Sequence, residues 1–313
     1  MLLPFRLAPT YKDYVWGGKR LRPQAEITAE AWVVYDQDVV LDGPYKGQTL
    51  AKAVELEGTA LLGSKVVHLS GRRFPLLIKL LDCANWLSLQ VHPNNDQAKK
   101  MAGPNQFGKA EAWYVIDADQ DAQLISGFKS NVTRDDLQKA VGKKEMLDLV
   151  ERRNVRTGDT IFMAPGTIHA LGPGLLIYEV QQNSDLTYRV YDWDRPADDN
   201  RKLHIDESLL VLNPNEKGEI KPFDEKETAT PIKTLAFCNY FSLTRLHGNK
   251  SVVKINTMGE SFAVITSING NISIIGSDWS FKLDALETLF VPAECPPFEV
   301  AFENESTALL ARC

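Results

Sequence analysis

Hydrophobic and polar residues alternate through residues 87–93, which predicts a β-strand with two unlike faces. The predicted apolar face is made of Leu87, Leu89 and Val91. The opposite face carries Gln90 and His92, two residues apart, so both side chains would point the same way, as a metal site requires. Pro93 ends the strand because it has no N–H to donate. Taken alone, the segment also fits a half-exposed edge strand with a histidine on its surface.

Other apolar runs predict further strands and a mainly β fold. Residues 74–81 are nearly all apolar, which is typical of a strand buried on both faces. Lys79 is the exception in this run: its side chain either extends to solvent or faces a polar pocket, and we expect the pocket because the candidate metal-binding strand comes next. Residues 175–182 predict another strand, on which Glu179 shares a face with apolar residues. A carboxylate in that position is costly unless it is paired or takes part in chemistry.

The sequence also predicts helices among the strands and a smaller domain at the C-terminal end. The helices are expected at about 94–102, 133–150 and 203–212. Residues 213–231 are rich in proline and charge, which indicates a linker. The segments that follow are strand-rich, with glycine and asparagine between them, and favour a small barrel or sandwich. We therefore expect one domain over 1–215 and a structural or interfacial β domain over 216–313.

Two of the five histidines, His92 and His169, fall at strand positions with polar neighbours. His169 follows a Pro-Gly turn, and hairpins of this kind recur in small β-barrels, where the histidine points into the barrel mouth. With Gln90 and Glu111 they form a candidate set of nitrogen and oxygen ligands without a thiolate, which suits Zn²⁺ or another borderline divalent ion. The four residues are far apart in the sequence. Lys109 and Glu111, at the entrance of a strand, would by themselves fit an ordinary surface ion pair.

Composition and charge narrow the possible partners. The chain has 313 residues, a net charge of −6 and an isoelectric point near 5.5, which argues against general nucleic-acid binding because that needs a basic face. An anionic small substrate needs only a few cations placed locally and is not excluded. Four cysteines without a CxxC pair favour a reducing cytoplasm. No stretch reaches the roughly 18 apolar residues of a membrane span, so we expect no membrane partner.

Four motifs give the chain a resemblance to a known family. In sequence order they are LSLQVHP, GKAEAWYV, APGTIHALG and QQNSDLTYRVYDWDR. They resemble the type I mannose-6-phosphate isomerase family, to which the N-terminal VWGG and the run FPLLIKLLD are also similar. The resemblance covers most of residues 1–212. It implies a cupin fold, a jelly-roll β-barrel with helical insertions that forms the catalytic domain, and a second, smaller cupin-like β domain, as in the compact bacterial members.

The resemblance also implies a metal site. It implies that one Zn²⁺ per chain is bound by three residues: His92, Glu111 and His169. In longer family members the glutamine of QVHP is a fourth ligand, so Gln90 is a candidate for that position. The chain departs from the family at residues 30–32, where Glu-Ala-Trp replaces the frequent Glu-Ser-Trp. That strand lines the site in relatives, so the fit of the substrate could differ.

Catalytic and substrate-binding residues follow from the same motifs. Arg189, in the SD-x-x-x-R run, matches the family's active-site arginine, and Lys109, two residues before the metal-binding glutamate, matches a lysine of the site. Glu179, on the strand between His169 and Arg189, is a further catalytic candidate. The expected substrate-binding residues are Lys79, Trp16 and Asp185. Trp16 lies in a glycine-rich loop that would deliver an aromatic ring, although it could equally fill a hydrophobic gap.

The main hypothesis is a zinc-dependent isomerase that interconverts mannose 6-phosphate and fructose 6-phosphate through an enediol. Its partner would be this small sugar phosphate, with no nucleic acid, and the protein would be a monomer or homodimer. One alternative is a cupin that binds a sugar phosphate as a sensor, and another is an isomerase for a related sugar phosphate. An iron-dependent cupin oxygenase would usually carry more histidines on its paired hairpins.

Overall fold

The computed structural model describes residues 2–196, 201–227 and 229–313. The chain is mainly β, as the sequence predicts, and its Cα positions group into two compact units. The first unit comprises Met1–Thr10, Trp32–Lys79 and Asp224–Cys313, and the second comprises Tyr11–Ala31 and Leu80–Phe223. Both are therefore assembled from separate parts of the sequence. The division at residues 215 and 216 stays a prediction about domains.

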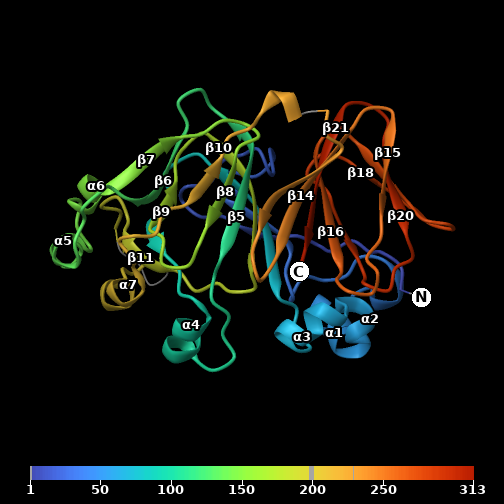
Figure 1. Ribbon diagram of the computed structural model, residues 1–313, viewed down its shortest axis with the longest axis horizontal. Coiled ribbons are helices and arrows are strands. Elements are labelled where there is room, and N and C mark those ends of the chain that lie inside the picture. Colours follow the sequence, from blue (N-terminus) through green and yellow to red (C-terminus); the bar gives the residue numbers. More distant parts are fainter. Residues whose placement is uncertain (1, 197–200, 228) are drawn as a thin grey trace. The chain divides into compact units, whose positions relative to one another are not determined.

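Two sheets carry the strands of the second unit (Figure 1). The larger has the order β1 (Thr10–Lys12), β2 (Glu30–Val34), β3 (Leu76–Cys83), β10 (Leu175–Gln182), β5 (Glu111–Ala118), β8 (Thr160–Met163) and β12 (Glu219–Lys221). The smaller has the order β11 (Tyr188–Tyr191), β4 (Leu89–Val91), β9 (His169–Leu171), β6 (Gln123–Phe128) and β7 (Val150–Asn154). Strands β1, β2 and β3 contain residues of both units.

The inward side chains of the two sheets form one apolar core. It includes Leu81, Trp113, Val115, Leu124, Ile161, Leu171 and Ile177, which come from strands of both sheets. Antiparallel pairing joins β10 to β5, β5 to β8, β11 to β4 and β4 to β9. Two antiparallel sheets that bury a common core in this way form a jelly-roll sandwich or barrel.

Helices cover the outer face of the smaller sheet. They are α4 (Asn95–Ala102), α5 (Arg134–Ala140), α6 (Met146–Leu149) and α7 (Ile205–Val211). Apolar residues of α5, α6 and α7 pack in one cluster with the outward residues Leu89, Val91 and Ala170 of the sheet. The predicted alternation is confirmed only over β4, where Leu89 and Val91 meet the helices and the polar face turns inward. Leu87 lies outside the strand and packs in the inner core with Trp16.

The single helix expected over 133–150 is wrong, because the structure divides this segment into α5 and α6 and begins β7 at Val150. The predicted cap is correct: Thr133 Oγ1 accepts a hydrogen bond from the Asp136 N–H. The break comes at Gly142, which has a φ of +78° and whose N–H donates to the Val190 carbonyl. Helix α5 has ended at Ala140, and the positive φ at Gly142 is a conformation that favours glycine.

The first unit contains a second pair of antiparallel sheets. One has the order β13 (Ile232–Phe237), β14 (Ser242–Gly248), β21 (Ser306–Arg312), β16 (Ala263–Asn269) and β19 (Thr288–Val291). The other has the order β15 (Ser251–Ile255), β20 (Phe298–Phe302), β17 (Ile272–Ile275) and β18 (Ser280–Leu283). Their facing side chains include Leu246, Ile265, Ile274, Val300 and Leu310, and they form a continuous hydrophobic core.

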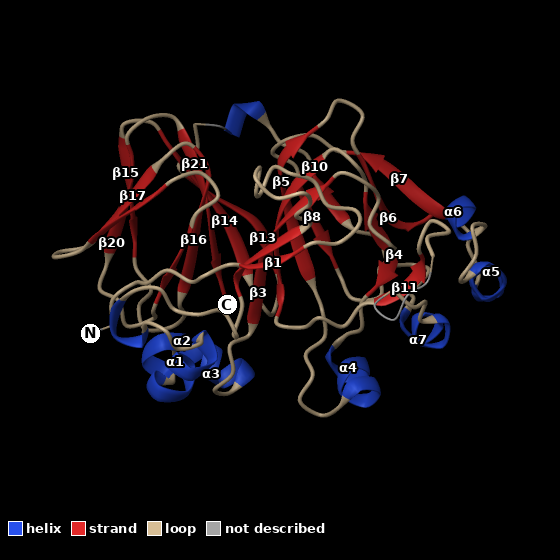
Figure 2. Cartoon of the chain, turned by 180° about the vertical axis from the view of Figure 1, so that it is seen from behind, coloured by secondary structure: helices blue, strands red, loops and turns tan. Residues whose placement is uncertain are grey.

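Helices from the early part of the sequence belong to this first unit. They are α1 (Leu50–Glu57), α2 (Thr59–Leu62) and α3 (Ser64–Ser70), which Figure 2 shows grouped together, and two short 3₁₀ helices lie at Gly43–Tyr45 and Glu225–Glu227. Backbone hydrogen bonds tie α2 and α3 to the C-terminal strands, for example from Phe262 N–H to the Leu62 carbonyl. None of the helices in the described parts of the chain is long and apolar enough to cross a membrane.

Asp38, in the first unit, predicts a pH-dependent stability. Its side chain is 1% exposed, and one carboxylate oxygen accepts a 2.7 Å hydrogen bond from Thr10. Burial raises the pKa of this carboxyl to about 7, and the nearby Asp36 raises it further, against the hydrogen bonds from Thr10 and at Tyr35. The unfolded chain releases this proton near pH 4, so folding binds a proton between about pH 4 and 7. Asp38 therefore lowers the free energy of unfolding as the pH rises through this range.

We expect Asp38→Asn to be more stable than the parent at pH 8, by on the order of 1–3 kcal/mol, with a smaller difference at pH 5. Urea unfolding of both proteins at the two pH values measures this. Asp278→Asn, at an exposed position of the same unit, controls for the loss of one negative charge. A difference between Asp38→Asn and the parent that does not grow with pH would contradict the assignment.

Candidate metal centre

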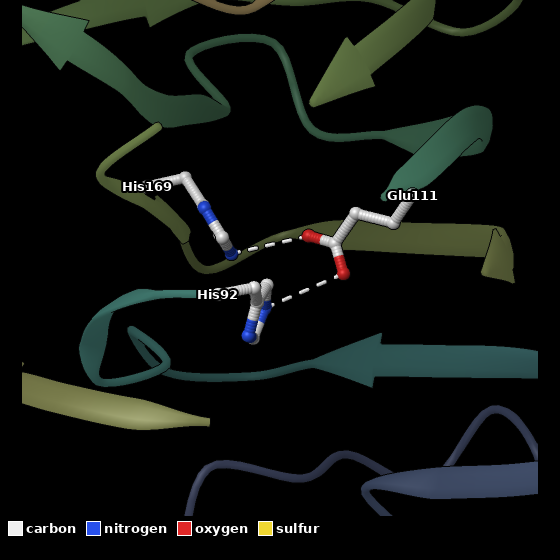
Figure 3. A group of neighbouring side chains, drawn as sticks. All are labelled: His92, Glu111 and His169. Carbon is white, nitrogen blue, oxygen red and sulfur yellow. Dashed lines mark ion pairs between the residues drawn. The ribbon is translucent and has the colours of Figure 1, made fainter. Parts of the chain in front are cut away.

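The three predicted ligands meet inside the second unit. Glu111 opens β5, His169 opens β9 and His92 directly follows β4. One oxygen of the Glu111 carboxylate, Oε1, is 3.1 Å from His169 Nε2, and the other, Oε2, is 3.4 Å from His92 Nε2 (Figure 3). All three residues are at most 2% exposed, and their candidate ligand atoms lie within 4.8 Å of one another. This group of side chains could hold a metal ion.

Backbone carbonyls fix the orientation of both imidazole rings. His92 Nδ1 is 2.9 Å from the Leu186 carbonyl oxygen, and His169 Nδ1 is 2.9 Å from that of Thr167. Because a carbonyl can only accept, each Nδ1 carries a proton, and a neutral ring held in this way presents a lone pair at Nε2. Metal-binding histidines in proteins are commonly held by a hydrogen bond of this kind.

Both lone pairs therefore face a carboxylate, an arrangement that is repulsive without a cation between the groups. Within the described residues, His92 Nε2 and both Glu111 oxygens have no hydrogen-bond partner. Buried polar atoms normally have one. Lys109 Nζ lies 3.2 Å from Glu111 Oε2, and His92 Nε2 and Glu111 Oε1 are left in positions that suit a further positive ion. Two imidazole nitrogens and a carboxylate fit a borderline divalent metal such as zinc.

Electrostatics keep the cluster in the form that binds a metal. Burial lowers the pKa of His92 well below its usual range and the Lys109 ammonium lowers it further, so this imidazole is neutral. Burial raises the pKa of the Glu111 carboxyl, but the Lys109 ammonium outweighs burial and holds that pKa well below the usual range. Lys109 Nζ is 3.2 Å from Glu111 Oε2, so the predicted pair exists and is buried rather than on the surface.

Two close backbone approaches bring the ligands together. The Lys109 N–H donates to the Pro93 carbonyl, and a Cβ at Gly108 would stand 2.5 Å from backbone atoms of Asn94 and Asn95. The start of β5 can therefore reach the turn after His92 only if residue 108 is glycine. In the same way the Gly166 N–H donates to the His92 carbonyl, and Gly166 has a φ of +89°.

Gln90 and Arg189 extend the site along the smaller sheet. Gln90 is paired with His169 on one side and with Arg189 on the other, so the three side chains share a face. Gln90 Nε2 is 3.2 Å from His169 Nε2, and its side-chain oxygen accepts from Ser88. Rotation of the amide by half a turn would offer the oxygen instead, and direct ligation by Gln90 stays a prediction. Arg189 Nη1 donates to the Lys202 carbonyl.

The remaining predicted residues are more dispersed. Trp16 is buried in the apolar core of the second unit, which favours the gap-filling interpretation that the sequence left open. Lys79, in the first unit, is 4% exposed, and its ammonium lies 5.0 Å from the centre of the Trp32 ring. Asp185 is exposed in the segment after β10. Contact of these three with a substrate stays a prediction.

Sequence reasoning missed Trp113, which touches two residues of the candidate site. Its indole Nε1–H donates a 2.8 Å hydrogen bond to Glu179, and its ring lies 5.4 Å from that of His169. The signal was present, because Trp113 stands two residues after Glu111 in a predicted strand and must share its face. Gln181, which is paired with Glu111 across the sheet, was overlooked in the same way.

Comparisons with known proteins show to which family the chain belongs. A sequence model of the catalytic domain of type I phosphomannose isomerase matches residues 4–129. Mannose-6-phosphate isomerase ManA of Bacillus subtilis is 33% identical over 309 residues, which cover 92% of this chain and 93% of that protein. The chain belongs to the type I phosphomannose isomerase family. A mannose-6-phosphate isomerase of Streptococcus mutans is 37% identical over 234 residues, covering 71% of this chain and 72% of that protein.

Structural comparison confirms the predicted fold. The crystal structure of the Bacillus subtilis mannose 6-phosphate isomerase matches 99% of both chains with a TM-score of 0.86 and 31% sequence identity. This phosphomannose isomerase fold is the mainly β cupin fold that the motifs implied.

We expect His169→Ala to lose its metal. The substitution removes one of the two nitrogen donors, so Gln90 and the Glu111–Lys109 pair lose the imidazole that they face. Zinc content should therefore fall from about one per chain to near zero after dialysis. Elemental analysis measures this. His247→Ala, a partly buried histidine of the first unit, should keep the zinc content of the parent protein. A fully zinc-loaded His169→Ala protein would refute the ligand assignment.

Proposed function

We propose that this chain interconverts mannose 6-phosphate and fructose 6-phosphate with a bound divalent metal ion, zinc. The buried His92–Glu111–His169 cluster carries the proposal, because its orphaned donor atoms fit a metal and because it lies in a chain of the type I phosphomannose isomerase family. The cytoplasm as its location and a monomer or homodimer as its assembly belong to the same proposal.

The reaction explains the set of charges at this site. An aldose becomes a ketose when one proton moves from C2 to C1 and another moves from O2 to O1. The intermediate is an enediol, and in its enediolate form the oxygens carry negative charge. A bound divalent cation supplies polarisation and orientation of these oxygens. The protein side chains would hold the sugar, place fixed positive charge near its oxygens and carry the proton.

Lys109 and Arg189 are the proposed fixed cations. Lys109 is buried against Glu111, and Arg189 shares a face of the sheet with Gln90 and His169. Either cation could stabilise the enediolate or hold the phosphate group. Arginine suits the second task because its planar guanidinium binds phosphate with two parallel hydrogen bonds.

Glu179 is the proposed proton carrier within the protein. It is a buried carboxylate on β10, in the interior of the same unit as the metal cluster. Carboxylates in such positions can take a proton from one carbon and return it to the next. One well-oriented base contributes about 10²–10⁴-fold to the rate.

A sugar-phosphate sensor remains the alternative from a different class of protein. Such a protein would keep the barrel and the metal but would not need both Lys109 and Arg189, and this chain has both. A related sugar phosphate as substrate is favoured by one observation, the departure from the family pattern at residues 30–32.

The proposal predicts chelator-sensitive turnover. A coupled assay would follow fructose 6-phosphate formed from mannose 6-phosphate before chelation, after chelation and after zinc is added back. Activity that disappears with the chelator and returns with zinc is the expected result. No turnover by the fully metal-loaded protein would refute the proposed reaction, and a panel of related sugar phosphates would then separate a different substrate from a sensor.

Arg189→Ala should keep its metal and lose about 100-fold or more in kcat, because a fixed cation near the developing charge is removed. Elemental analysis and steady-state kinetics measure the two effects separately. Arg134→Ala is the matched control, since this exposed arginine also donates to a backbone carbonyl, that of Leu209. Near-normal kcat in Arg189→Ala would show that this arginine is not catalytic.

A further inference from the structure

We propose that Trp113 is a positioning residue that joins the Glu179 carboxylate to the His169 ring, so that proton carrier and metal ligand keep a fixed relative position. The roles of Glu179 and His169 in this inference rest on the function proposed above. The connection itself rests on two contacts: the Trp113 hydrogen bond to Glu179 and the Trp113 ring contact with His169.

The first contact lies between neighbouring strands of the larger sheet. Glu179 on β10 and Trp113 on β5 stand directly opposite each other, and the indole N–H donates to Glu179 Oε2 at 2.8 Å. The pair Gln181 and Glu111 stands two residues along the same strands. The Glu179–Trp113 pair is therefore displaced from the Glu111 backbone by about 7 Å along the strand and faces the same interior.

The second contact connects the two sheets. The Trp113 and His169 rings have centroids 5.4 Å apart and planes inclined at 69°, which is an edge-to-face arrangement. His169 belongs to β9 of the smaller sheet, and its Nδ1 is held by the Thr167 carbonyl. The His169 ring is therefore held by the Thr167 carbonyl at Nδ1 and by the Trp113 indole at its side, while its Nε2 faces Glu111.

Packing alone does not explain an acidic partner for this indole. Trp113 is 1% exposed and Glu179 is 4% exposed, so both polar groups are removed from water. A backbone carbonyl or an amide could accept the indole proton at little cost, as the Leu87 carbonyl does for Trp193. A buried carboxylate is far more costly to desolvate, and its presence opposite Trp113 indicates that the charge itself has a use.

The hydrogen bond from Trp113 should raise the rate of the reaction by fixing the Glu179 carboxylate. A carboxylate with a freely rotating side chain would approach the substrate carbons in only a fraction of its rotamers, whereas one oxygen of Glu179 is fixed by the indole. Small displacements of a reacting group can cost about 10²-fold in rate. Loss of the indole N–H should therefore affect turnover more than substrate binding.

Kinetics of Trp113→Phe, Glu179→Gln and the double variant test the connection. Phenylalanine keeps an aromatic ring beside His169 but removes the N–H donor. We expect Trp113→Phe to lower kcat roughly 10- to 100-fold while KM changes less than about 2-fold. The double variant should be no slower than Glu179→Gln alone, because both substitutions break one unit. Zinc content should equal that of the parent protein in all three.

Trp193→Phe is the matched control, because it also removes an indole N–H that donates to an oxygen, here a backbone carbonyl. It should keep the kcat of the parent protein. Fold losses that multiply in the double variant would overturn the proposal, and so would a kcat loss in Trp193→Phe equal to that in Trp113→Phe. A loss of zinc that accounts for the whole loss of activity would also overturn it, since Trp113 would then act on His169 alone.

A spectroscopic measurement separates this inference from the proposed reaction. The chain has six tryptophans, and the indole N–H signal that disappears from the NMR spectrum of Trp113→Phe identifies Trp113. That signal should move in Glu179→Gln and again when zinc is added to the metal-free protein, but not in Glu151→Gln, whose carboxylate binds Lys217 and Arg153 elsewhere. If the parent protein fails to isomerise mannose 6-phosphate, the reaction is refuted while these shifts still support the connection. An indole signal unmoved by Glu179→Gln would refute the connection.

Discussion

The structure of the site depends on one buried carboxylate facing two imidazole lone pairs. Glu111 cannot be stable there as an isolated charge, because its transfer from water costs several kcal/mol without a partner. The Lys109 ammonium at 3.2 Å offsets part of this cost, and the orphaned nitrogen and oxygen atoms leave the rest to a metal. The pairing of β4 with β9 and the close approach at Gly108 bring the two imidazoles to this carboxylate.

Each sheet contributes one set of side chains near the Glu111 carboxylate, and the two sets contain different types of residue. On the smaller sheet Arg189, Gln90 and His169 follow one another across neighbouring strands. On the larger sheet Glu111 and Gln181 form one pair, with Trp113 and Glu179 forming the next. The proposed cation and metal ligands thus occupy one layer of the interior, and the proposed proton carrier lies one pair further along β5 and β10, next to residues of the apolar core.

Much of this could be predicted from the sequence because the site lies on strands. A period of two places Gln90 with His92, and it places Glu111 with Trp113, without any knowledge of the fold. The contacts that sequence reasoning missed join residues far apart in the chain. The break before Gly142 accompanies its hydrogen bond to Val190, and α3 is bonded to residues near 260, and neither contact leaves a local signal. The same reason explains why the compact units are discontinuous.

Both units use two antiparallel sheets around a core, and their inward residues decide what each can do. In the first unit the corresponding interior holds Leu246, Ile265 and Val300, which fill the space and offer no ligand atom. In the second unit inward positions are occupied by Glu111 and Glu179, at a cost in stability that an apolar residue would not incur. The proposed chemistry therefore depends on a few inward polar residues in an architecture that both units share, and the fold alone would not have revealed it.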